Sequence, residues 1–337
     1  MGIKNLKKLI QKHVPGAISD KPSLYNQKLA IDSSILLYKF RYTYTEDNFH
    51  IQGFLHKVIE FLEKGIIPVF VFDGPPPDAK KVTLDKRMDT RIKMKERIDE
   101  LKIQRNELNK DSLIDIDEFI NDSSDSDSEN EIVNEIVKEI KKINIQIKNI
   151  EKNILIVKKF HSDEVMEFLN SLGIPFLKAI SESEETCAYL QKNDLVDYVL
   201  TEDTDSLTFG AKKVIFGEKV YTLETILEGF ELSYSSFIDL CILCGCDYTS
   251  TIPKIGPVNA LKLIKKYQSI DNFENIIIPE EFNYQLARSL FTQNENYQIN
   301  CSFEIKPMDI PKVKSLFERY TLNEYFLNKL KILLKSN

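Results

Sequence analysis

The sequence lacks the features that would direct a chain into a membrane or a secretory pathway. No apolar run approaches 18 residues, so no segment is predicted to span a bilayer. The first residues, MGIKNLKKLI, do not have the layout of a signal peptide, and Leu6 stands where a myristoylation signal needs Ser or Thr. The five cysteines are an odd number, which indicates a reducing compartment rather than a disulfide framework. An intracellular protein is therefore expected.

Motifs for nucleotide hydrolysis, dinucleotide binding and zinc binding are also missing. Neither GxxxxGK nor GxGxxG occurs, and the four histidines form no HExxH pair. The segment CILCGC (241–246) has the cysteines of half a zinc site, but no second Cys or His cluster completes it. Its apolar neighbours instead favour the buried end of a helix.

Positive charge is in deficit over the whole chain, which has 45 Lys and Arg, 52 Asp and Glu, and a net charge of −7. The deficit is local, because ten acids and no Lys or Arg lie between Asp111 and Glu135. The rest of the chain has 42 acidic and 45 basic residues. The negative total therefore does not exclude a nucleic acid as partner.

Short apolar runs alternate with amphipathic stretches outside the middle of the chain. The predicted strands are KLAIDSSILLY (28–38), PVFVFDG (68–74), GIPFLKA (173–179), VDYVLTED (196–203) and KKVIFGE (212–218). The predicted helices between them are 50–65, 162–173 and 183–193. This alternation predicts an α/β fold with a mostly parallel central sheet covered by helices on both sides.

Between residues 80 and 157 the alternation stops. The stretch 80–105 reads as a basic helix without Gly or Pro. A second helix is predicted from a heptad seam, which consists of Val133, Ile136, Ile140, Ile143, Ile147, Ile150, Ile154 and Val157. The simplest architecture is an antiparallel helical hairpin, an arch at residues 88–157 that projects from the sheet and separates residues 1–87 from residues 158–337. Its tip, at about residues 110–131, has an acidic low-complexity composition and is expected to be disordered.

Acidic residues follow several of the predicted strands. Glu202, Asp203 and Asp205 stand close together in TEDTD, where carboxylates repel one another unless positive charge or water lies among them. The full set is Asp32 (AIDSS), Asp73 (VFDG), Glu182 and Glu184 (SESEE), Asp203 and Asp205 (TEDTD), and Asp247 (CGCDY). Taken singly, TEDTD and VFDG could be surface turns, and Ser181 with Glu184 could be a helix capping box.

Together these acids indicate a metal site. The carboxyl ends of parallel strands meet at one edge of a sheet, so the side chains that follow them should converge. Converging carboxylates are usually neutralised by Mg²⁺, which prefers oxygen ligands. Two such ions about 4 Å apart can stabilise both oxygens of a phosphodiester displacement.

The motifs occur in an order that identifies a family. MGI, AIDSS, VFDG, SESEE, TEDTDSLTFG, LCILCGCDY and IPKIGPVNALKLI together resemble the flap endonuclease/XPG superfamily of structure-specific 5′ nucleases, over residues 1–87 and about 155–270. The resemblance implies that Asp32, Asp73 and Glu184 hold one Mg²⁺ and that Asp203, Asp205 and Asp247 hold the other, with Mn²⁺ as a substitute. Glu182 would orient water or share a ligand.

The same resemblance implies contacts with DNA. Lys80 and Arg87 match a Lys and an Arg of the family that act on the scissile phosphate, and their spacing of seven places them on one helix face. Tyr38 matches an aromatic residue on which the terminal base stacks, although it could equally be a core residue. Ile255 and Gly256 match loop amides that, with a bound K⁺, contact a duplex phosphate within a helix–hairpin–helix at about 237–267. Gly2, in the MGI motif, is a further expected DNA contact.

The expected activity is Mg²⁺-dependent cleavage of DNA near a 5′ flap or another single-strand/duplex junction, with an accompanying 5′–3′ exonuclease. The partner would be branched or flapped DNA, and the protein would act as a monomer in replication, repair or recombination. The arch is longer than in ordinary flap endonucleases, and SLFERYTLNEYFLNKLKILLKSN contains no sliding-clamp motif, so no clamp partner is expected. The alternatives are an XPG-like nuclease for bubbles or junctions, and a non-catalytic protein that binds branched DNA.

Overall fold

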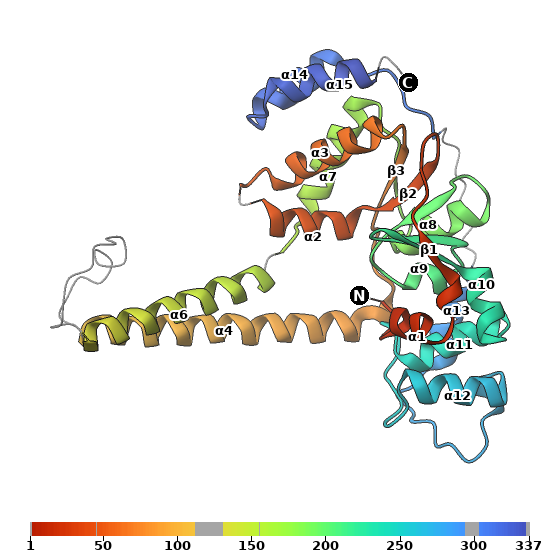
Figure 1. Ribbon diagram of the computed structural model, residues 1–337. Coiled ribbons are helices and arrows are strands. Elements are labelled where there is room, and N and C mark those ends of the chain that lie inside the picture. The colour runs from red at the N-terminus through yellow and green to blue at the C-terminus, as the bar shows by residue number, and fades with distance from the viewer. Residues whose placement is uncertain (1, 45, 112–130, 155, 294–302, 335–337) are drawn as a thin grey trace. The chain divides into compact units, whose positions relative to one another are not determined.

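The computed structural model describes residues 2–44, 46–111, 131–154, 156–293 and 303–334. The chain divides into two compact units (Figure 1): Met1–Lys81 together with Val157–Asn337, and the stretch between them, Val82–Ile156. The predicted arch (88–157) overlaps the second unit. Within the described ranges, no helix has both the length and the apolar character that a membrane crossing requires.

Seven strands form one sheet in the first unit, in the order β1-β7-β6-β5-β2-β3-β4. Strands β6, β5, β2, β3 and β4 run parallel, which confirms the predicted mostly parallel sheet, whereas β7 and β1 add an antiparallel edge. The strands are β1 (Ile18–Asp20), β2 (Lys28–Asp32), β3 (Ile67–Phe72), β4 (Phe176–Lys178), β5 (Tyr198–Leu200), β6 (Lys213–Phe216) and β7 (Lys219–Thr222).

The central strands β2 and β3 are apolar almost throughout and are buried on both faces. Such runs are typical of parallel strands that helices cover on both sides. After Asp32 the chain turns at once into helix α2 (Ser33–Thr43), so the second half of the predicted strand KLAIDSSILLY is helical. The Asp32 carboxylate starts this helix as its N-cap, because it accepts hydrogen bonds from the amides of Ser34 and Ile35.

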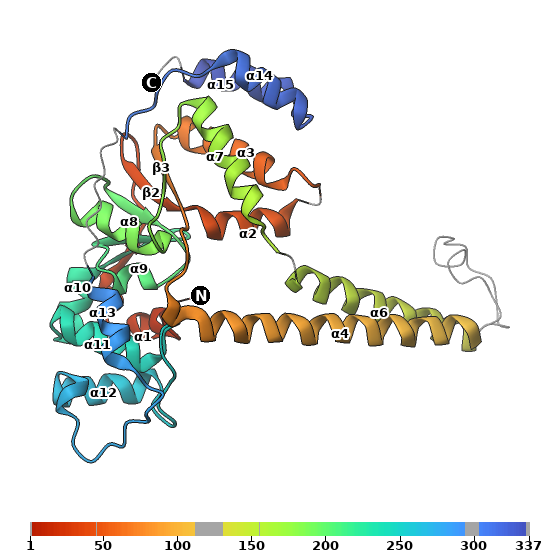
Figure 2. The same cartoon turned by 180° about the vertical axis from the view of Figure 1, so that it is seen from behind.

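Alternate residues of the central strands enter two separate hydrophobic cores. Ala30 and Val69 belong to one core, and Leu29 and Phe70 belong to the other. The first core contains residues of α1 (Leu6–His13), α8 (Ser183–Lys192), α10 (Leu223–Phe230), α11 (Tyr234–Cys244), α12 (Pro257–Tyr267) and α13 (Tyr284–Thr292). The second contains residues of α2, α3 (Phe49–Glu63), α7 (Lys159–Leu172), α14 (Ile310–Arg319) and α15 (Glu324–Leu333). Helices therefore cover the sheet on both sides, as predicted (Figures 1 and 2).

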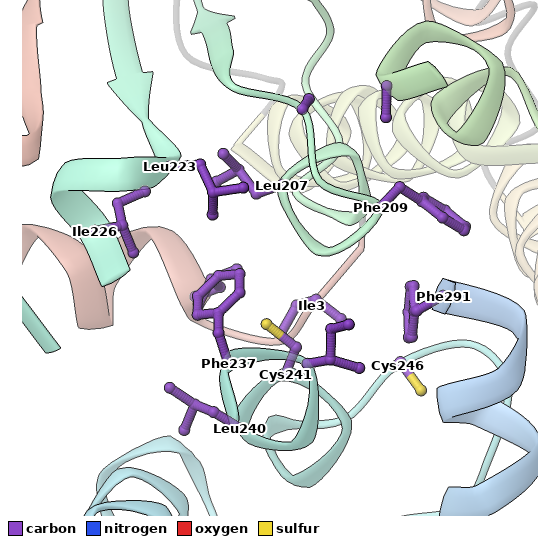
Figure 3. Close-up of a cluster of buried hydrophobic side chains, with 14 of the residues drawn as sticks. Ile3, Leu207, Phe209, Leu223, Ile226, Phe237, Leu240, Cys241, Cys246 and Phe291 are labelled. Carbon is purple, nitrogen blue, oxygen red and sulfur yellow. The ribbon is translucent and has the colours of Figure 1, made fainter. Parts of the chain in front are cut away.

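The cysteines of CILCGC lie in the first core. Cys241 and Cys246 are surrounded by apolar side chains (Figure 3), and Cys244 is buried with them. Burial raises the pKa of Cys244 and of Cys246 to about 12, so both thiols stay protonated at neutral pH. The prediction of a buried helix end is confirmed, since α11 ends at Cys244.

The second unit contains an antiparallel pair of helices, α4 (Lys81–Asp111) and α6 (Glu131–Ile154). Ile98 and Leu101 of α4 are buried against Ile143 and Ile147 of α6, so the predicted heptad seam is the contact surface. Its last member, Val157, lies outside the pair and packs on the second core of the first unit. Most of the predicted acidic tip (about 110–131) falls on residues 112–130, which lie outside the described residues.

Candidate active site

The candidate acids come from strand ends and helix termini of the first unit. Because β2, β3 and β5 are parallel, the residues after them meet at one edge of the sheet. The acids are Asp32 (end of β2), Asp73 (after β3), Glu182 (N-cap of α8), Glu184 (first turn of α8), Asp203 (after β5), Asp205 (start of α9, Asp205–Thr208) and Asp247 (after α11). Helix α8 has no side-chain cap hydrogen bond, so the capping box that Ser181 and Glu184 could form is absent.

Ser183, between the two glutamates of SESEE, connects three of these acids. Its amide donates to Oδ1 of Asp73 at 2.9 Å. Its hydroxyl lies 3.0 Å from Oδ1 of Asp32 and 3.2 Å from Oε2 of Glu184, so it can donate to either. The acids expected to share one metal ion are therefore gathered around one serine.

A second chain of hydrogen bonds orders the TEDTD segment. The Thr201 hydroxyl donates to Oδ2 of Asp32 at 3.0 Å and accepts from the amide of Asp203, also at 3.0 Å. The Asp205 amide donates to Oδ1 of Asp203. Gly2 has φ +81°, and a Cβ at this position would collide with Oδ1 of Asp203. The start of the chain thus packs directly against the acid cluster, and a glycine is needed there.

Glu202, the remaining acid of TEDTD, does not join the cluster. Its carboxylate lies 3.3 Å from Nζ of Lys7, and its side chain is 54% exposed. Glu202 lies between Thr201 and Asp203, which are both buried, and its own side chain faces outward. Among the acids of this motif, only the two aspartates belong to the candidate site.

Lys80 and Tyr248 both donate to Glu182, on different oxygens. The Lys80 ammonium bonds Oε1, and the Tyr248 hydroxyl bonds Oε2. Lys80 also lies 3.5 Å from Oδ2 of Asp247. Lys80 ends a short 3₁₀ turn, Asp78–Lys80, directly before α4, the helix that carries Arg87.

The pKa values of the buried acids record the crowding of negative charge. Burial, then repulsion from Asp73, raises the pKa of Asp32 to about 7. Burial, then Asp32 and Asp203, raises the pKa of Glu184 well above its usual value. The pKa of Asp205 is raised for the same reasons, by burial and by Asp203 and Asp247. A cluster of this kind favours bound cations.

Lys80 supplies part of the positive charge that the cluster needs. Burial alone would lower its pKa, but Glu182, followed by Glu184 and Asp247, raises the pKa of this ammonium above its usual value. Lys80 is therefore a permanent cation among the acids. One lysine cannot neutralise seven carboxylates, so the cluster has room for further positive charge.

The cluster fits divalent metal ions by its chemistry. Oδ1 of Asp205 is buried and accepts no hydrogen bond, which leaves a desolvated carboxylate oxygen on one of the acids of the cluster. All the donors are carboxylate oxygens, the ligands that Mg²⁺ and Ca²⁺ prefer. In the part of the chain that the structure describes, no three His, Cys, Asp or Glu side chains are already arranged as a metal site. These acids accept hydrogen bonds from Ser183, Thr201, Lys80 and Tyr248, so binding would require some of them to rotate.

Tyr38 lines a hollow of about 160 Å³ beside the cluster. Its side chain is half-buried, and Asp73, Lys158 and Lys159 also line the hollow. The structure therefore places Tyr38 at an accessible surface next to one acid rather than in a core. Arg87 lies on α4, in the second unit.

The predicted helix–hairpin–helix corresponds to α11, α12 and the loop between them. The Ile255 amide donates to the carbonyl of Ile252 at 3.1 Å, whereas Gly256 is the N-cap of α12, with Pro257 in its first turn. Lys254 has φ 65° in the left-handed region, which turns the loop toward the helix start. Of the two predicted phosphate donors, only Ile255 already uses its amide within the loop.

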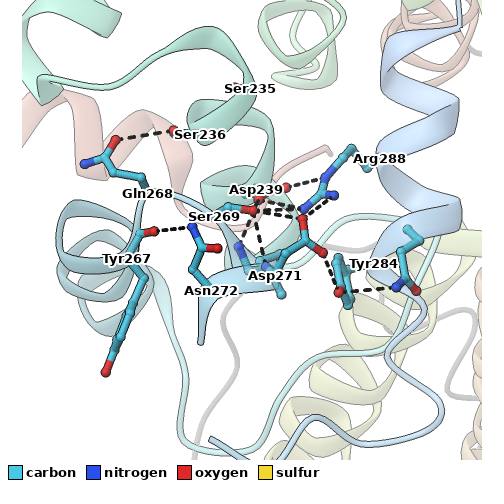
Figure 4. A network of polar contacts seen from close by, with 12 residues as sticks. Ser235, Ser236, Asp239, Tyr267, Gln268, Ser269, Asp271, Asn272, Tyr284 and Arg288 are labelled. Atoms are coloured by element: carbon cyan, nitrogen blue, oxygen red, sulfur yellow. Dashed lines mark hydrogen bonds and ion pairs between the residues drawn. The ribbon is translucent and has the colours of Figure 1, made fainter. Parts of the chain in front are cut away.

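A polar network joins this element to α13 (Figure 4). The Arg288 guanidinium binds Asp239 of α11 through Nε and Nη2, each at 2.8 Å, and binds Asp271 through Nη1 at 2.8 Å. Tyr284 donates to Asp271 at 2.7 Å. Asp271 belongs to a short 3₁₀ turn, Ile270–Asn272. The network fixes α11, this turn and α13 to one another.

Three hydrogen-bonding residues of the cluster were not predicted from the sequence: Ser183, Thr201 and Tyr248. Ser183 and Tyr248 stand directly beside predicted acids, in SESEE and CGCDY, and Thr201 stands two residues before Asp203, in TEDTD. This closeness to a predicted acid was the signal in the sequence that could have pointed to these residues. It could not show which neighbours turn inward, because this depends on where the strand or helix ends.

Comparisons with known proteins agree with this geometry. The model of the XPG N-terminal domain matches residues 1–94, and that of the XPG I-region matches residues 173–247. Flap endonuclease 1-A of Sorghum bicolor is 36% identical over 323 residues, which cover 87% of this chain and 75% of the relative. Flap endonuclease 1 of Danio rerio is 34% identical over 326 residues, which cover 88% and 76%.

Solved structures show the same fold. The catalytic core of Rad2 in complex with DNA substrate superposes with a TM-score of 0.64 at 22% identity, and the match covers 98% of this chain and 100% of that one. Flap endonuclease-1 from Methanococcus jannaschii gives a TM-score of 0.64 at 21% identity, covering 97% and 98%. Nucleases of this family generally depend on divalent metal ions, and a two-metal mechanism is typical of them. The chain therefore belongs to the flap endonuclease/XPG superfamily of structure-specific 5′ nucleases.

Proposed function

We propose that this protein uses Mg²⁺ to cut DNA at 5′ flaps and other single-strand/duplex junctions, and that it also degrades 5′ ends as an exonuclease. The observation that carries the proposal is the acid cluster of the first unit, with its hydrogen bonds and the unpaired buried oxygen of Asp205. The similarity to flap endonucleases over most of the chain supports the flap as substrate.

The hydrogen bonds within the cluster suggest how the acids would divide between two ions. Asp32, Asp73 and Glu184, which surround Ser183, would hold one ion. The second would be held by Asp203, Asp205 and Asp247, and Glu182 would serve between the two groups. When bound, the ions would supply the positive charge that stabilises a phosphodiester transition state.

The remaining residues would act on the DNA itself. Lys80, placed between Glu182 and Asp247, would donate to the scissile phosphate together with Arg87 and stabilise the charge that develops there. The Tyr38 ring would stack on a terminal base beside Asp73.

At the other end of the substrate, the α11–α12 element would contact the duplex. The start of α12 offers backbone amides and a favourable helix dipole to a phosphate. Gly256 would donate first, with Ile255 and a bound K⁺ as further contacts, and Gly2 would lie near the strand that enters the cluster. None of these groups reads base edges, so substrate choice would follow the shape of the junction.

Two acids of TEDTD, Asp205 inside the cluster and Glu202 outside it, offer a matched test. Asp205→Asn should abolish cleavage of a labelled 5′ flap in Mg²⁺ while it leaves flap binding within a few-fold, because affinity comes mainly from phosphate contacts elsewhere. Glu202→Gln changes a neighbouring acid that points to Lys7 and should cut at the wild-type rate. Near-normal cleavage by Asp205→Asn would contradict the proposed site. An inactive wild type that still binds flaps would support a non-catalytic binder of branched DNA.

The preferred junction is tested by a panel of labelled substrates. Flap, blocked flap, bubble, Holliday junction and nicked duplex should be cut in single-turnover assays with excess enzyme. We expect the free 5′ flap to be cut fastest. A bubble or junction cut faster than the flap would identify an XPG-like specificity instead.

A further inference from the structure

Tyr248 is a buried tyrosine that contacts two other elements of the first unit. It lies in the loop between α11 and α12, and its side chain is only 4% exposed. Its hydroxyl donates to Oε2 of Glu182 at the start of α8. Its ring packs edge-on against Phe291 of α13, with the ring centroids 5.0 Å apart.

Further buried side chains pack behind the ring that holds Tyr248. Phe291 packs in turn on Phe209, with centroids 5.0 Å apart, and both belong to the buried cluster of Figure 3. Helix α13 is tied to α11 through Arg288 and Asp239. Since the ring of Tyr248 is held by packing, its hydroxyl has a fixed position toward Glu182.

Glu182 is thereby held from two sides by donors of different kinds. Lys80 bonds Oε1 and carries a charge that the proposed mechanism directs to the DNA phosphate. Tyr248 bonds Oε2 through a neutral hydroxyl.

We propose that Tyr248 is a positioning residue that fixes the Glu182 carboxylate for metal binding. When Lys80 moves to the DNA, Tyr248 remains as the donor that keeps Glu182 in the orientation a bound ion needs. The inference rests on the proposed metal role of the acid cluster. Loss of such a supporting hydrogen bond typically costs about 10- to 100-fold in metal affinity or activity.

The test compares two tyrosines whose hydroxyls each donate a hydrogen bond within the first unit. Tyr248→Phe removes the hydroxyl and keeps the ring on Phe291. Tyr234→Phe is the matched control, because the Tyr234 hydroxyl donates to a backbone carbonyl, that of Thr208, at 2.7 Å. Binding of Mn²⁺ to the DNA-free protein is measured by electron paramagnetic resonance, and kcat and KM are measured on a 5′ flap in Mg²⁺. Thermal unfolding with EDTA checks that both variants fold.

Tyr248→Phe should weaken Mn²⁺ binding about 10- to 100-fold and lower kcat by a similar factor, with little change in KM. Tyr234→Phe should stay near wild type in Mn²⁺ binding, kcat and KM. Wild-type Mn²⁺ binding by Tyr248→Phe would overturn the inference, and so would an equal loss in Tyr234→Phe. Asp205→Asn separates the two proposals. If Asp205→Asn loses Mn²⁺ binding and Tyr248→Phe keeps it, the metal site is supported and the proposed role of Tyr248 is wrong. If Asp205→Asn binds Mn²⁺ normally, the metal site itself is wrong.

Discussion

Replacing Asp32 by Asn should make the stability of the metal-free protein less dependent on pH. Asp32 is 1% exposed, and burial, then repulsion from Asp73, raises its pKa from the ordinary 3.8 to about 7. A carboxyl whose pKa is higher in the folded state stabilises the fold while it is protonated. That stabilisation is complete below about pH 4 and is lost as the pH rises through about 7.

The size of the effect follows from the pKa shift. A rise from 3.8 to about 7 corresponds to about 4 kcal/mol in the free energy of unfolding. Asn has no charge to lose, and its side-chain oxygen can still accept the hydrogen bonds from Ser34 and Ile35 that cap α2. The substitution should therefore remove the titration and keep the helix start.

The assay is urea unfolding of both proteins in EDTA at pH 4.5, 6 and 8. The unfolding free energy of wild type minus that of Asp32→Asn should fall by about 3 kcal/mol between pH 4.5 and pH 8, because roughly 1 kcal/mol of the full effect is already lost at pH 4.5. Added Mg²⁺ at pH 8 should stabilise the wild type more than the variant, because the ions bind the charged carboxylate. A difference that stays constant across the pH range to within about 1 kcal/mol would refute the reasoning.

Three further substitutions test other contacts. Lys80→Ala should slow single-turnover flap cleavage by on the order of 10²–10³ and weaken flap binding far less, whereas equal losses would reduce Lys80 to a general phosphate contact. Arg288→Met leaves the Asp239 carboxylate, which is 3% exposed, without its cation. Denaturant unfolding at pH 7 should then show that the free energy of unfolding falls by about 3–5 kcal/mol. An unchanged unfolding midpoint would show that the ion pair contributes little to stability. Gly2→Ala should slow cleavage about tenfold by displacing Asp203, and a wild-type rate would mean that the chain start shifts freely.

The parts of the fold that sequence reasoning predicted are those that a regular pattern encodes. Strands β2 and β3 are apolar runs, and the heptad seam of α6 recurs along the helix, so both follow from local periodicity. The antiparallel edge was missed because β1 is three residues long and mostly exposed, which leaves no periodicity to detect. Its partner β7 follows a two-residue turn at Gly217, directly after β6.

The acids of the candidate site could be predicted from the sequence. The side chains that donate hydrogen bonds to these acids could not. The acids stand in recognisable motifs, and their convergence follows from the parallel sheet. Ser183 and Tyr248 became visible only in the folded chain, because their hydroxyls meet acids that are distant in sequence. Lys80 was expected inside a helix, and its position in a 3₁₀ turn depends on how the chain leaves Pro77.

The interleaved order of the strands has a consequence for the synthesis of the protein. Strand β2 lies between β3 and β5, so Leu29 finds its partner Tyr198 only after more than half of the chain has been made. The proposed ligands extend from Asp32 to Asp247 of 337 residues. Because a chain is made from its N-terminus, an unfinished product carries Asp32 and Asp73 long before it can complete a site. Chains that end before Asp247, whether still on the ribosome or released early, would therefore be unable to cut DNA.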